Sequence, residues 1–265
     1  MSVQTYLDTI SRNAILKDST ITTSISTLQR RLGYYFDNSV VIRHFAFGSN
    51  TRYTMLPRKY DPQSDVDYMV VFSNTGHQPQ TYLNRLKNFV ECYYSSSERK
   101  QSHPTIKLNL HHITFELVPA VYNTMYGYQI PAPANNFETW ISTNPNDFNS
   151  KLTDKNRSNY SLIKPLIRIL KYWNANAGYV FESYELEQNI VSMNFLFCYN
   201  IKDYFYHAVG QLNCSYWFPQ WKQNAITKLK NTVIAVKAYE SGGMPYSAEA
   251  EIKKFFLIFN ASIFI

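Results

Sequence analysis

Cysteine and charge are both scarce in this sequence. Three cysteines, Cys92, Cys198 and Cys214, are scattered over 265 residues and form neither a C-x-x-C pair nor the Cys/His spacing of a zinc site. This odd, dispersed set suits buried thiols in a reducing compartment, so we expect a cytoplasmic protein. Charged residues supply 17% of the chain and apolar residues 45%, a balance that is typical of a globular protein and argues against a disordered one.

Long apolar runs and long basic runs are also missing. The longest apolar stretch, residues 255–265, is too short to cross a bilayer and contains Asn260, so we expect it to dock into the protein. Residues 1–5 lack the basic and apolar regions of a signal peptide. No run of five Lys or Arg residues occurs, so the net charge of +7 favours anionic partners such as NTPs without giving direct evidence for nucleic-acid binding. We expect no membrane contact.

Two alternating carboxylates are the most informative feature that is present. Asp65 and Asp67 open a stretch that continues as the apolar run 68–72. Side chains alternate along a strand, so both carboxylates point to the same face. Their mutual repulsion is relieved by a divalent cation, and hard oxygen ligands suit Mg²⁺ or Mn²⁺. The alternative is a solvated strand start, which is the commoner explanation of an isolated Asp-x-Asp.

A Gly-Ser turn and a third acid accompany this pair. Gly48 and Ser49 follow the apolar-rich residues 43–47, and a turn without a Cβ brings backbone N–H groups and a hydroxyl close to a phosphate. No Walker loop is present, and an ordinary turn remains the alternative. Glu116 interrupts the apolar strand 113–118, where an acid needs a partner or a metal unless it faces water.

The order of the elements predicts an α+β protein with two lobes. We expect helices within residues 3–37 and after Pro79, and strands at residues 40–47, 65–72, 105–110 and 113–118. The Pro131-Ala132-Pro133-Ala134 loop is a crossing point between lobes, and helical patterns dominate after it. We therefore predict a catalytic lobe with N-terminal helices over residues 1–135 and a helical lobe over residues 136–265.

The second half holds two candidate anion contacts. Lys164, Arg168 and Lys171 share one face of a helix, which is either a solvated face or a grip for a triphosphate. Ser183 is expected as an N-cap, or as a phosphate contact at the helix N-terminus. Tyr184 stacks on a base or, as for most single tyrosines, packs in the core.

In this order, these motifs resemble the polymerase-β-type nucleotidyltransferases. More narrowly, they resemble the cGAS/DncV-like nucleotidyltransferases (CD-NTases) of bacterial antiphage defence. The resemblance rests on Phe47-Gly48-Ser49 with Arg52 and Thr54, Ser64-Asp65-Val66-Asp67, Phe115-Glu116-Leu117-Val118-Pro119-Ala120, Thr139-Trp140-Ile141-Ser142-Thr143-Asn144-Pro145, Leu166 to Asn174, and Ser183-Tyr184-Glu185-Leu186-Glu187. Two departures concern the turn. Tyr53 stands where the family often has a glycine, and the gap between Ser49 and Asp65 is long and holds two prolines.

The resemblance implies a bilobal fold with a mixed sheet and a helical C-terminal lobe, closing on a nucleotide. It assigns Asp65, Asp67 and Glu116 to catalysis and to two Mg²⁺ or Mn²⁺ ions. For nucleotide binding it assigns Gly48, Ser49, Lys171, Ser183 and Tyr184.

The function that the resemblance implies is synthesis of a cyclic di- or trinucleotide from NTPs, ATP among them, in antiphage (CBASS) signalling, with a downstream effector that reads the product. Two alternatives remain open. One is template-independent nucleotide transfer to RNA or protein, and the other is a catalytically silent nucleotide-binding relative.

Overall fold

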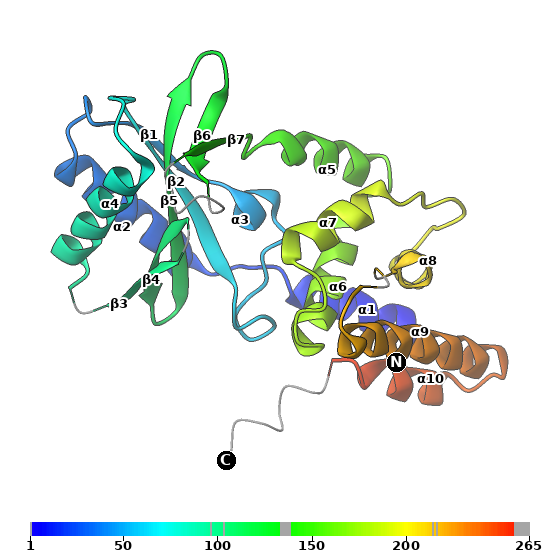
Figure 1. Ribbon diagram of the computed structural model, residues 1–265. Helices are drawn as coiled ribbons and strands as arrows, with labels where there is room; N and C mark the ends of the chain where they lie inside the picture. The colour runs from blue at the N-terminus through cyan, green and yellow to red at the C-terminus, as the bar shows by residue number, and fades with distance from the viewer. Residues whose placement is uncertain are drawn as a thin grey trace. The chain divides into compact units, whose positions relative to one another are not determined.

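The computed structural model describes residues 2–95, 97–102, 104–132, 139–213, 215 and 217–256 (Figure 1). Pro133, Ala134, Cys214 and residues 257–265, which figured in the expectations above, lie outside them. In chain order the elements are α1 (Val3–Asn13), α2 (Ser19–Tyr35), β1 (Val41–Ala46), α3 (Gly48–Arg52), β2 (Asp65–Phe72), α4 (Pro79–Tyr93), β3 (Glu98–Ser102), β4 (Thr105–Leu110), β5 (Ile113–Asn123), β6 (Gly127–Pro131), β7 (Trp140–Thr143), α5 (Asp147–Arg157), α6 (Ile163–Asn176), α7 (Ser183–Ser192), α8 (Ile201–Gln211), α9 (Gln220–Ser241) and α10 (Pro245–Lys253).

The chain divides into two compact units, which we call the sheet unit and the helical unit. The sheet unit comprises Lys17–Arg58 and Gln63–Asn149, and the helical unit comprises Met1–Leu16, Lys59–Pro62 and Ser150–Ile265. The predicted mixture of strands first and helices afterwards is therefore confirmed as an α+β architecture.

The division differs from the single boundary expected after residue 135. One reason is that β7 pairs with β6, so the sheet continues beyond that position. A second is that α1 packs against α6, α8 and α10. Val3, Leu7 and Ile10 recur at helical spacing along its buried face. The helix nearest the N-terminus thus belongs with the C-terminal helices.

The sheet is mixed and has β1-β2-β5-β4-β3 as its main order, with β6 pairing with both β5 and β7. β2 and β5 run parallel from the pair Asp65–Thr114 to the pair Phe72–Val121, and the other pairs are antiparallel. The expected strand 113–118 is longer than predicted, because it continues through Pro119 to Asn123. Because β2 and β5 run parallel, a long connection is needed between them, and it contains α4, β3 and β4.

The two faces of β2 have different neighbours. Val66, Tyr68, Val70 and Phe72 are buried on the face toward α2 and α4. On that face the ring of Phe72 lies 5.2 Å from the ring of Tyr82 in α4. Figure 1 shows α2 and α4 side by side there. The opposite face begins with the two predicted carboxylates and continues as an apolar cluster.

That apolar cluster consists of Met69, Val71 and Ala120, and partly buried hydrophobic side chains cover it. The covering residues are Phe45, Phe47, Tyr128 and Ile130. Because β1 and β6 supply most of this cover, only the start of β2 presents polar groups on this face.

The helical unit is organised around α6. Apolar residues on several sides of this helix are buried, including Leu166, Ile169 and Trp173. Arg168 and Lys171 are buried as well, so the solvated-face alternative for the basic stripe is wrong for these two residues. Pro165 lies in the first turn, where its missing N–H removes no helical hydrogen bond, so it begins the helix and does not kink it.

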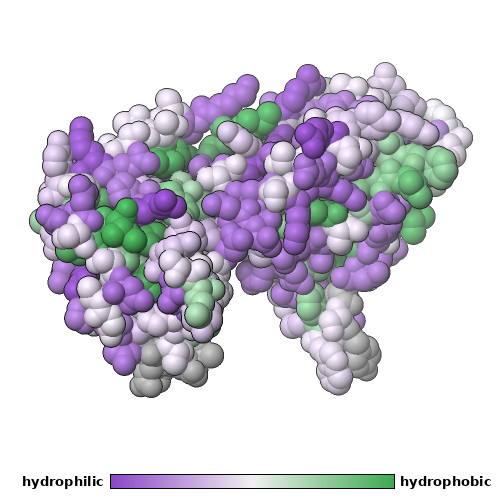
Figure 2. Space-filling view, turned by 90° about the horizontal axis from the view of Figure 1, so that it is seen from above, coloured by the Kyte–Doolittle hydropathy of each residue, from purple (hydrophilic) through white to green (hydrophobic). Residues whose placement is uncertain are grey.

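The two cysteines that the structure describes differ in burial. Cys198 is buried as expected, whereas Cys92 is exposed. No helix in the part of the chain that the structure describes is long and apolar enough to cross a membrane. On the face shown in Figure 2, hydrophilic residues are interleaved with smaller hydrophobic groups.

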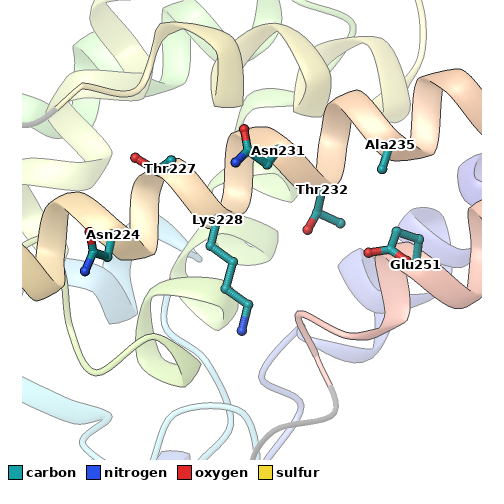
Figure 3. A pocket seen from close by; sticks show the side chains of 7 residues that line it. All are labelled: Asn224, Thr227, Lys228, Asn231, Thr232, Ala235 and Glu251. Atoms are coloured by element: carbon teal, nitrogen blue, oxygen red, sulfur yellow. The ribbon is translucent and has the colours of Figure 1, made fainter.

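A polar hollow of about 400 Å³ lies on the helical unit (Figure 3). Its lining comes from α9 except for Glu251, which points from α10 toward α9. A second hollow, of about 390 Å³, lies on the sheet unit beside Arg43, Val71, Tyr122 and Tyr128. Neither hollow includes a residue that the sequence analysis assigned to the site.

Candidate active site

Three carboxylates meet on one face of the sheet. Asp65 and Asp67 alternate on β2, and the parallel register sets Asp67 directly beside Glu116 of β5. Paired residues on neighbouring strands share a face, and the strands lie about 4.8 Å apart. The three predicted acids are therefore brought together, by strand pairing and not by proximity in the sequence.

Crowding of like charges changes the chemistry of Asp65. Burial, and then the charges of Asp67 and Glu116, raise the pKa of Asp65 to about 8, and a hydrogen bond with Glu116 acts in the same direction. A carboxyl group in this setting retains a proton well above the usual range for aspartate. Ionisation of Asp65 is therefore unfavourable in this site, and a bound cation would make it less so.

Lys107 is a member of the site that the sequence analysis missed. It lies on β4 opposite Glu116, and its Nζ is 2.6 Å from Oε1 of Glu116. The hydrogen bond with Glu116 raises the pKa of Lys107. In the sequence Lys107 is only the polar half of an alternating strand, so its role becomes visible once the register of β4 on β5 is known.

The donor set fits a hard divalent cation. It consists of carboxylate oxygens, the ligands that Mg²⁺ and Mn²⁺ prefer, and their repulsion is what such an ion removes. Within the described ranges, no three acidic, histidine or cysteine side chains already form a metal-binding group, and Glu116 is held by Lys107. Metal binding would therefore require Glu116 to exchange its partner, and a pair of ions remains a prediction.

The glycine turn lies directly against these carboxylates. The backbone N–H of Phe47 donates to the carbonyl of Asp67 at 3.0 Å, which holds the end of β1 on β2. Gly48 follows with a φ of +70°, and a Cβ built on it would lie 2.0 Å from Oδ2 of Asp67. Only glycine allows both this conformation and this approach. Ser49 comes next, in the first turn of α3.

Tyr53, which stands where the family often has a glycine, is located at the end of α3. It ends α3 in the left-handed conformation, with a φ of 61°, and is 74% exposed. Glycine is common at this position of a helix end because it adopts positive φ without strain. Tyrosine adopts the same left-handed conformation here, so this position does not require glycine. Thr54 then donates its backbone N–H back to the carbonyl of Ser49 at 3.1 Å.

The long loop after Tyr53 is also ordered by contacts. Arg52 is buried and lies over the ring of Phe148, and Arg58 donates to Oγ1 of Thr114 at 2.6 Å. Both arginines are therefore packed in the sheet unit. Further along, Tyr60 packs edge-on against Tyr172, and residues 59–62 of the loop belong to the helical unit.

The other predicted nucleotide contacts belong to the helical unit. Lys171 of α6 is buried and pairs with Glu187 of α7. Ser183 is the first residue of α7, and Glu182 occupies the N-cap without a side-chain cap, so the predicted N-cap is wrong by one position. Tyr184 follows it and is 48% exposed, so its ring is accessible enough for a base to stack on it.

Arg168, from the same basic stripe, is fixed elsewhere. Its Nε donates to the carbonyl of Ser11, in the last turn of α1, at 3.2 Å. Burial lowers the pKa of Arg168 to about 10. This arginine therefore joins α6 to α1, where its charge also complements the negative end of the helix.

Comparison with known proteins gives concordant results. Residues 1–156 match the family described as Second Messenger Oligonucleotide or Dinucleotide Synthetase domain (SMODS). A probable cyclic nucleotide synthase of Bacillus cereus strain VD146 is 26% identical over 243 residues, covering 74% of this chain and 71% of that protein.

Solved structures extend the similarity to the whole fold. CdnC of Escherichia coli MS115-1, solved with ATP, matches with a TM-score of 0.69 at 12% identity, over 97% of this chain and 98% of that chain. CdnE of Elizabethkingia meningoseptica, a cyclic dinucleotide synthase solved with GTP and Apcpp, has a TM-score of 0.66 at 17% identity, over 86% and 97% of the two chains. The cyclic AMP-GMP synthase DncV of Vibrio cholerae has a TM-score of 0.66 at 12% identity, over 82% and 68%.

Replacement of Gly48 by alanine should destabilise the protein more than replacement of another left-handed glycine. Gly76 has a φ of +74°, and no atom of the described residues lies within 4 Å of the position that a Cβ would take there. Gly76→Ala therefore reports backbone strain alone, about 1 kcal/mol. Gly48→Ala adds the collision with Asp67, about 1–3 kcal/mol more. Urea unfolding of both variants measures the difference. Equal losses of stability would contradict the close approach to Asp67.

The raised pKa of Asp65 predicts a pH dependence of stability. The folded state keeps this proton up to about pH 8, whereas the unfolded chain releases it near the ordinary value of 3.8. Because the folded state binds more protons between these values, the free energy of unfolding should fall as the pH rises from 5 to 8 without divalent ions. Asp65→Asn should flatten this slope.

Asp37→Asn is the matched control for this measurement. Asp37 is exposed, and hydrogen bonds from Ser39 lower its pKa, so it is ionised in both states throughout the pH range tested. Urea unfolding at pH 5, 6, 7 and 8 compares the three proteins. An unchanged slope in Asp65→Asn would refute the assignment.

Proposed function

Because the chain belongs to the SMODS family, within the cGAS/DncV-like nucleotidyltransferases, we propose that it joins NTPs into a cyclic di- or trinucleotide. It is a nucleotidyltransferase with the polymerase-β-like fold. The observation that supports the proposal best is the carboxylate cluster, in which Asp65, Asp67 and Glu116 share a sheet face with Gly48 against them. The relatives that carry the name of cyclic nucleotide synthase agree with it.

The proposed reaction is attack of a ribose hydroxyl on the α-phosphate of an NTP. A bond forms between the hydroxyl oxygen and the α-phosphorus, the bond to the bridging oxygen of the β-phosphate breaks, and pyrophosphate leaves. Two Mg²⁺ or Mn²⁺ ions held by Asp65, Asp67 and Glu116 would supply an acidified hydroxyl and charge stabilisation on the phosphoryl oxygens. Glu116 accepts the proton of the hydroxyl, and Lys107 offsets its charge between turnovers.

The residues proposed to contact the nucleotide are those that match the nucleotide-binding motifs of the family. Gly48 and Ser49 meet the phosphates of the donor, since the turn has no Cβ and lies at the carboxylates. Ser183 and Tyr184, at the start of α7, offer helix N–H groups and an aromatic face. Lys171 is assigned to the triphosphate through its place in the motif.

A role in bacterial antiphage (CBASS) signalling completes the proposal. ATP is among the substrates, and a downstream effector reads the cyclic product. Nucleotide transfer to RNA or protein would use the same carboxylates and is the alternative that product size distinguishes. The presence of all three acids and of the close Gly48 argues against a silent relative.

Product analysis tests the proposed function. The purified protein is incubated with Mg²⁺ or Mn²⁺ and all four labelled NTPs, treated with phosphatase, and its products are identified by mass spectrometry. We expect a phosphatase-resistant cyclic product, and at least a ~100-fold loss in Asp67→Asn because the metal ligands are incomplete.

The same assay needs a surface control and has clear contrary results. Asp37→Asn changes an exposed aspartate of the sheet unit in the same way and should keep full activity. Full activity in Asp67→Asn would refute the site. Nucleotides added only to a polymer would favour the linear alternative, and NTP binding without pyrophosphate release would favour the silent one.

A further inference from the structure

Lys107 is a basic side chain in direct contact with the carboxylate cluster. Its Nζ lies 2.6 Å from Oε1 of Glu116, and the two side chains are 42% and 20% exposed. The hydrogen bond with Glu116 raises the pKa of Lys107, and the charges of all three acids act in the same direction. One ammonium group therefore partly neutralises the cluster, which is also what a divalent cation would do.

Strand register brings this pair together, and exposure makes it exchangeable. Lys107 on β4 is directly opposite Glu116 on β5, so both side chains lie on the carboxylate face of the sheet. Because water reaches the ammonium group, the attraction in such a pair is weak, and either partner can be replaced at little cost. The fold therefore keeps Lys107 beside the cluster even when Glu116 binds something else.

Arg58, a second basic side chain near this face, has partners of another kind. It donates to Oγ1 of Thr114 at 2.6 Å and to the carbonyl of His111 at 3.3 Å. Thr114 is two residues before Glu116 on β5, so the two share a face. Both acceptors are neutral, and neither is a proposed metal ligand. A change of partner by Glu116 therefore affects Lys107 and leaves these contacts of Arg58 unchanged.

Use of Glu116 as a metal ligand would leave this ammonium group without its anion. In the proposed reaction Glu116 holds an ion, so its pair with Lys107 is given up. A partly buried charge then favours another partner of opposite sign. The nucleotide supplies one, since its phosphates come to the ions that the same carboxylates are assigned to hold. Lysine binds phosphate as a flexible point charge, so this contact needs no fixed geometry.

We propose that Lys107 is a nucleotide-binding residue, which exchanges Glu116 for a substrate phosphate when the divalent ions bind. In the protein without ions, Lys107 competes with them for Glu116. In the protein with ions, Lys107 holds the nucleotide. This inference rests on the proposed function, because it concerns the same ions and the same nucleotide, and it makes the binding of one depend on the other.

Replacement of Lys107 by methionine separates this exchange from a fixed ion pair, because the two ligands respond in opposite ways. Without nucleotide, Lys107→Met should bind Mn²⁺ about fivefold more tightly, since the ion no longer displaces an ammonium group. At saturating Mn²⁺ it should bind an ATP analogue about tenfold more weakly, since a charge-assisted hydrogen bond to phosphate is lost. The analogue has a methylene group between its α- and β-phosphates and cannot release pyrophosphate. Electron paramagnetic resonance measures free Mn²⁺, and calorimetry measures binding of the analogue.

Other combinations of results contradict the exchange. Unchanged affinities for both ligands, or a loss of both, would mark a structural ion pair. Weaker binding of the analogue with unchanged Mn²⁺ affinity would mark a phosphate contact that never competes with the ions. Tighter Mn²⁺ binding with unchanged affinity for the analogue would mark a counter-ion that does not meet the nucleotide.

A second background tests whether the competition passes through Glu116. Removal of any nearby positive charge strengthens cation binding by simple electrostatics. In Glu116→Gln the carboxylate for which Lys107 competes is gone, so addition of Lys107→Met should change the Mn²⁺ affinity less than about twofold. A full fivefold gain in this background as well would refute the exchange and leave only a general charge effect.

Two further variants serve as controls. Lys107→Arg keeps a positive charge that binds phosphate and should retain the affinity for the analogue to within about threefold. Lys87 is exposed on α4, which packs against the sheet from its other face, and Lys87→Met should change neither affinity. Equal effects at Lys87 would overturn a specific role for Lys107.

These measurements separate failure of the exchange from failure of the proposed function. Neither affinity requires turnover, so a missing cyclic product would refute the synthase and leave the test of Lys107 intact. Unchanged affinities in Lys107→Met would refute the exchange alone. If the original protein bound neither Mn²⁺ nor the analogue, both proposals would fall.

Discussion

Parallel pairing of β2 with β5 places like charges side by side, and the surrounding structure is arranged to tolerate this. The register that aligns Asp67 with Glu116 also aligns the buried apolar residues that follow them. On one face these strands pack against α4, where Phe72 meets Tyr82, and on the other the apolar cluster of Met69, Val71 and Ala120 is covered, so the carboxylates cannot move apart by separation of the strands. Repulsion is relieved in two other ways, by a proton retained on Asp65 and by Lys107. Binding of a cation would replace both.

The helical unit buries positive charges, and these have acceptors on other helices. There Lys171 and Arg168 are buried on one helix, and each has an acceptor from another element, Glu187 and the carbonyl of Ser11. Glu187 matches the charge of Lys171, whereas the acceptor of Arg168 is a neutral carbonyl. Desolvation offsets much of the attraction in such a buried pair, so the pair adds little stability by itself. One unit therefore concentrates like charge where chemistry is proposed, and the other gives each of these buried cations an acceptor on a neighbouring helix.

Local pattern was enough to predict the parts of the site that depend on one segment. Alternation placed Asp65 and Asp67 on one face, and the absence of a Cβ identified Gly48. Residues whose roles depend on pairing were missed. Lys107 needed the register of β4, and Glu187 looked like one more polar residue of α7 until α6 was beside it. The short strands β6 and β7 were also missed, because four or five residues carry little periodicity.

The division of the chain has a consequence for how the protein acquires its fold. The two units use five alternating segments, so the backbone passes between them four times. The helical unit needs α1 to meet α10, which lies more than two hundred residues later in the chain. Such distant contacts carry a large loop-closure entropy and form slowly. During synthesis the sheet unit, whose segments end at Asn149, is complete first, so α1 must wait for its partners with its apolar face unpaired.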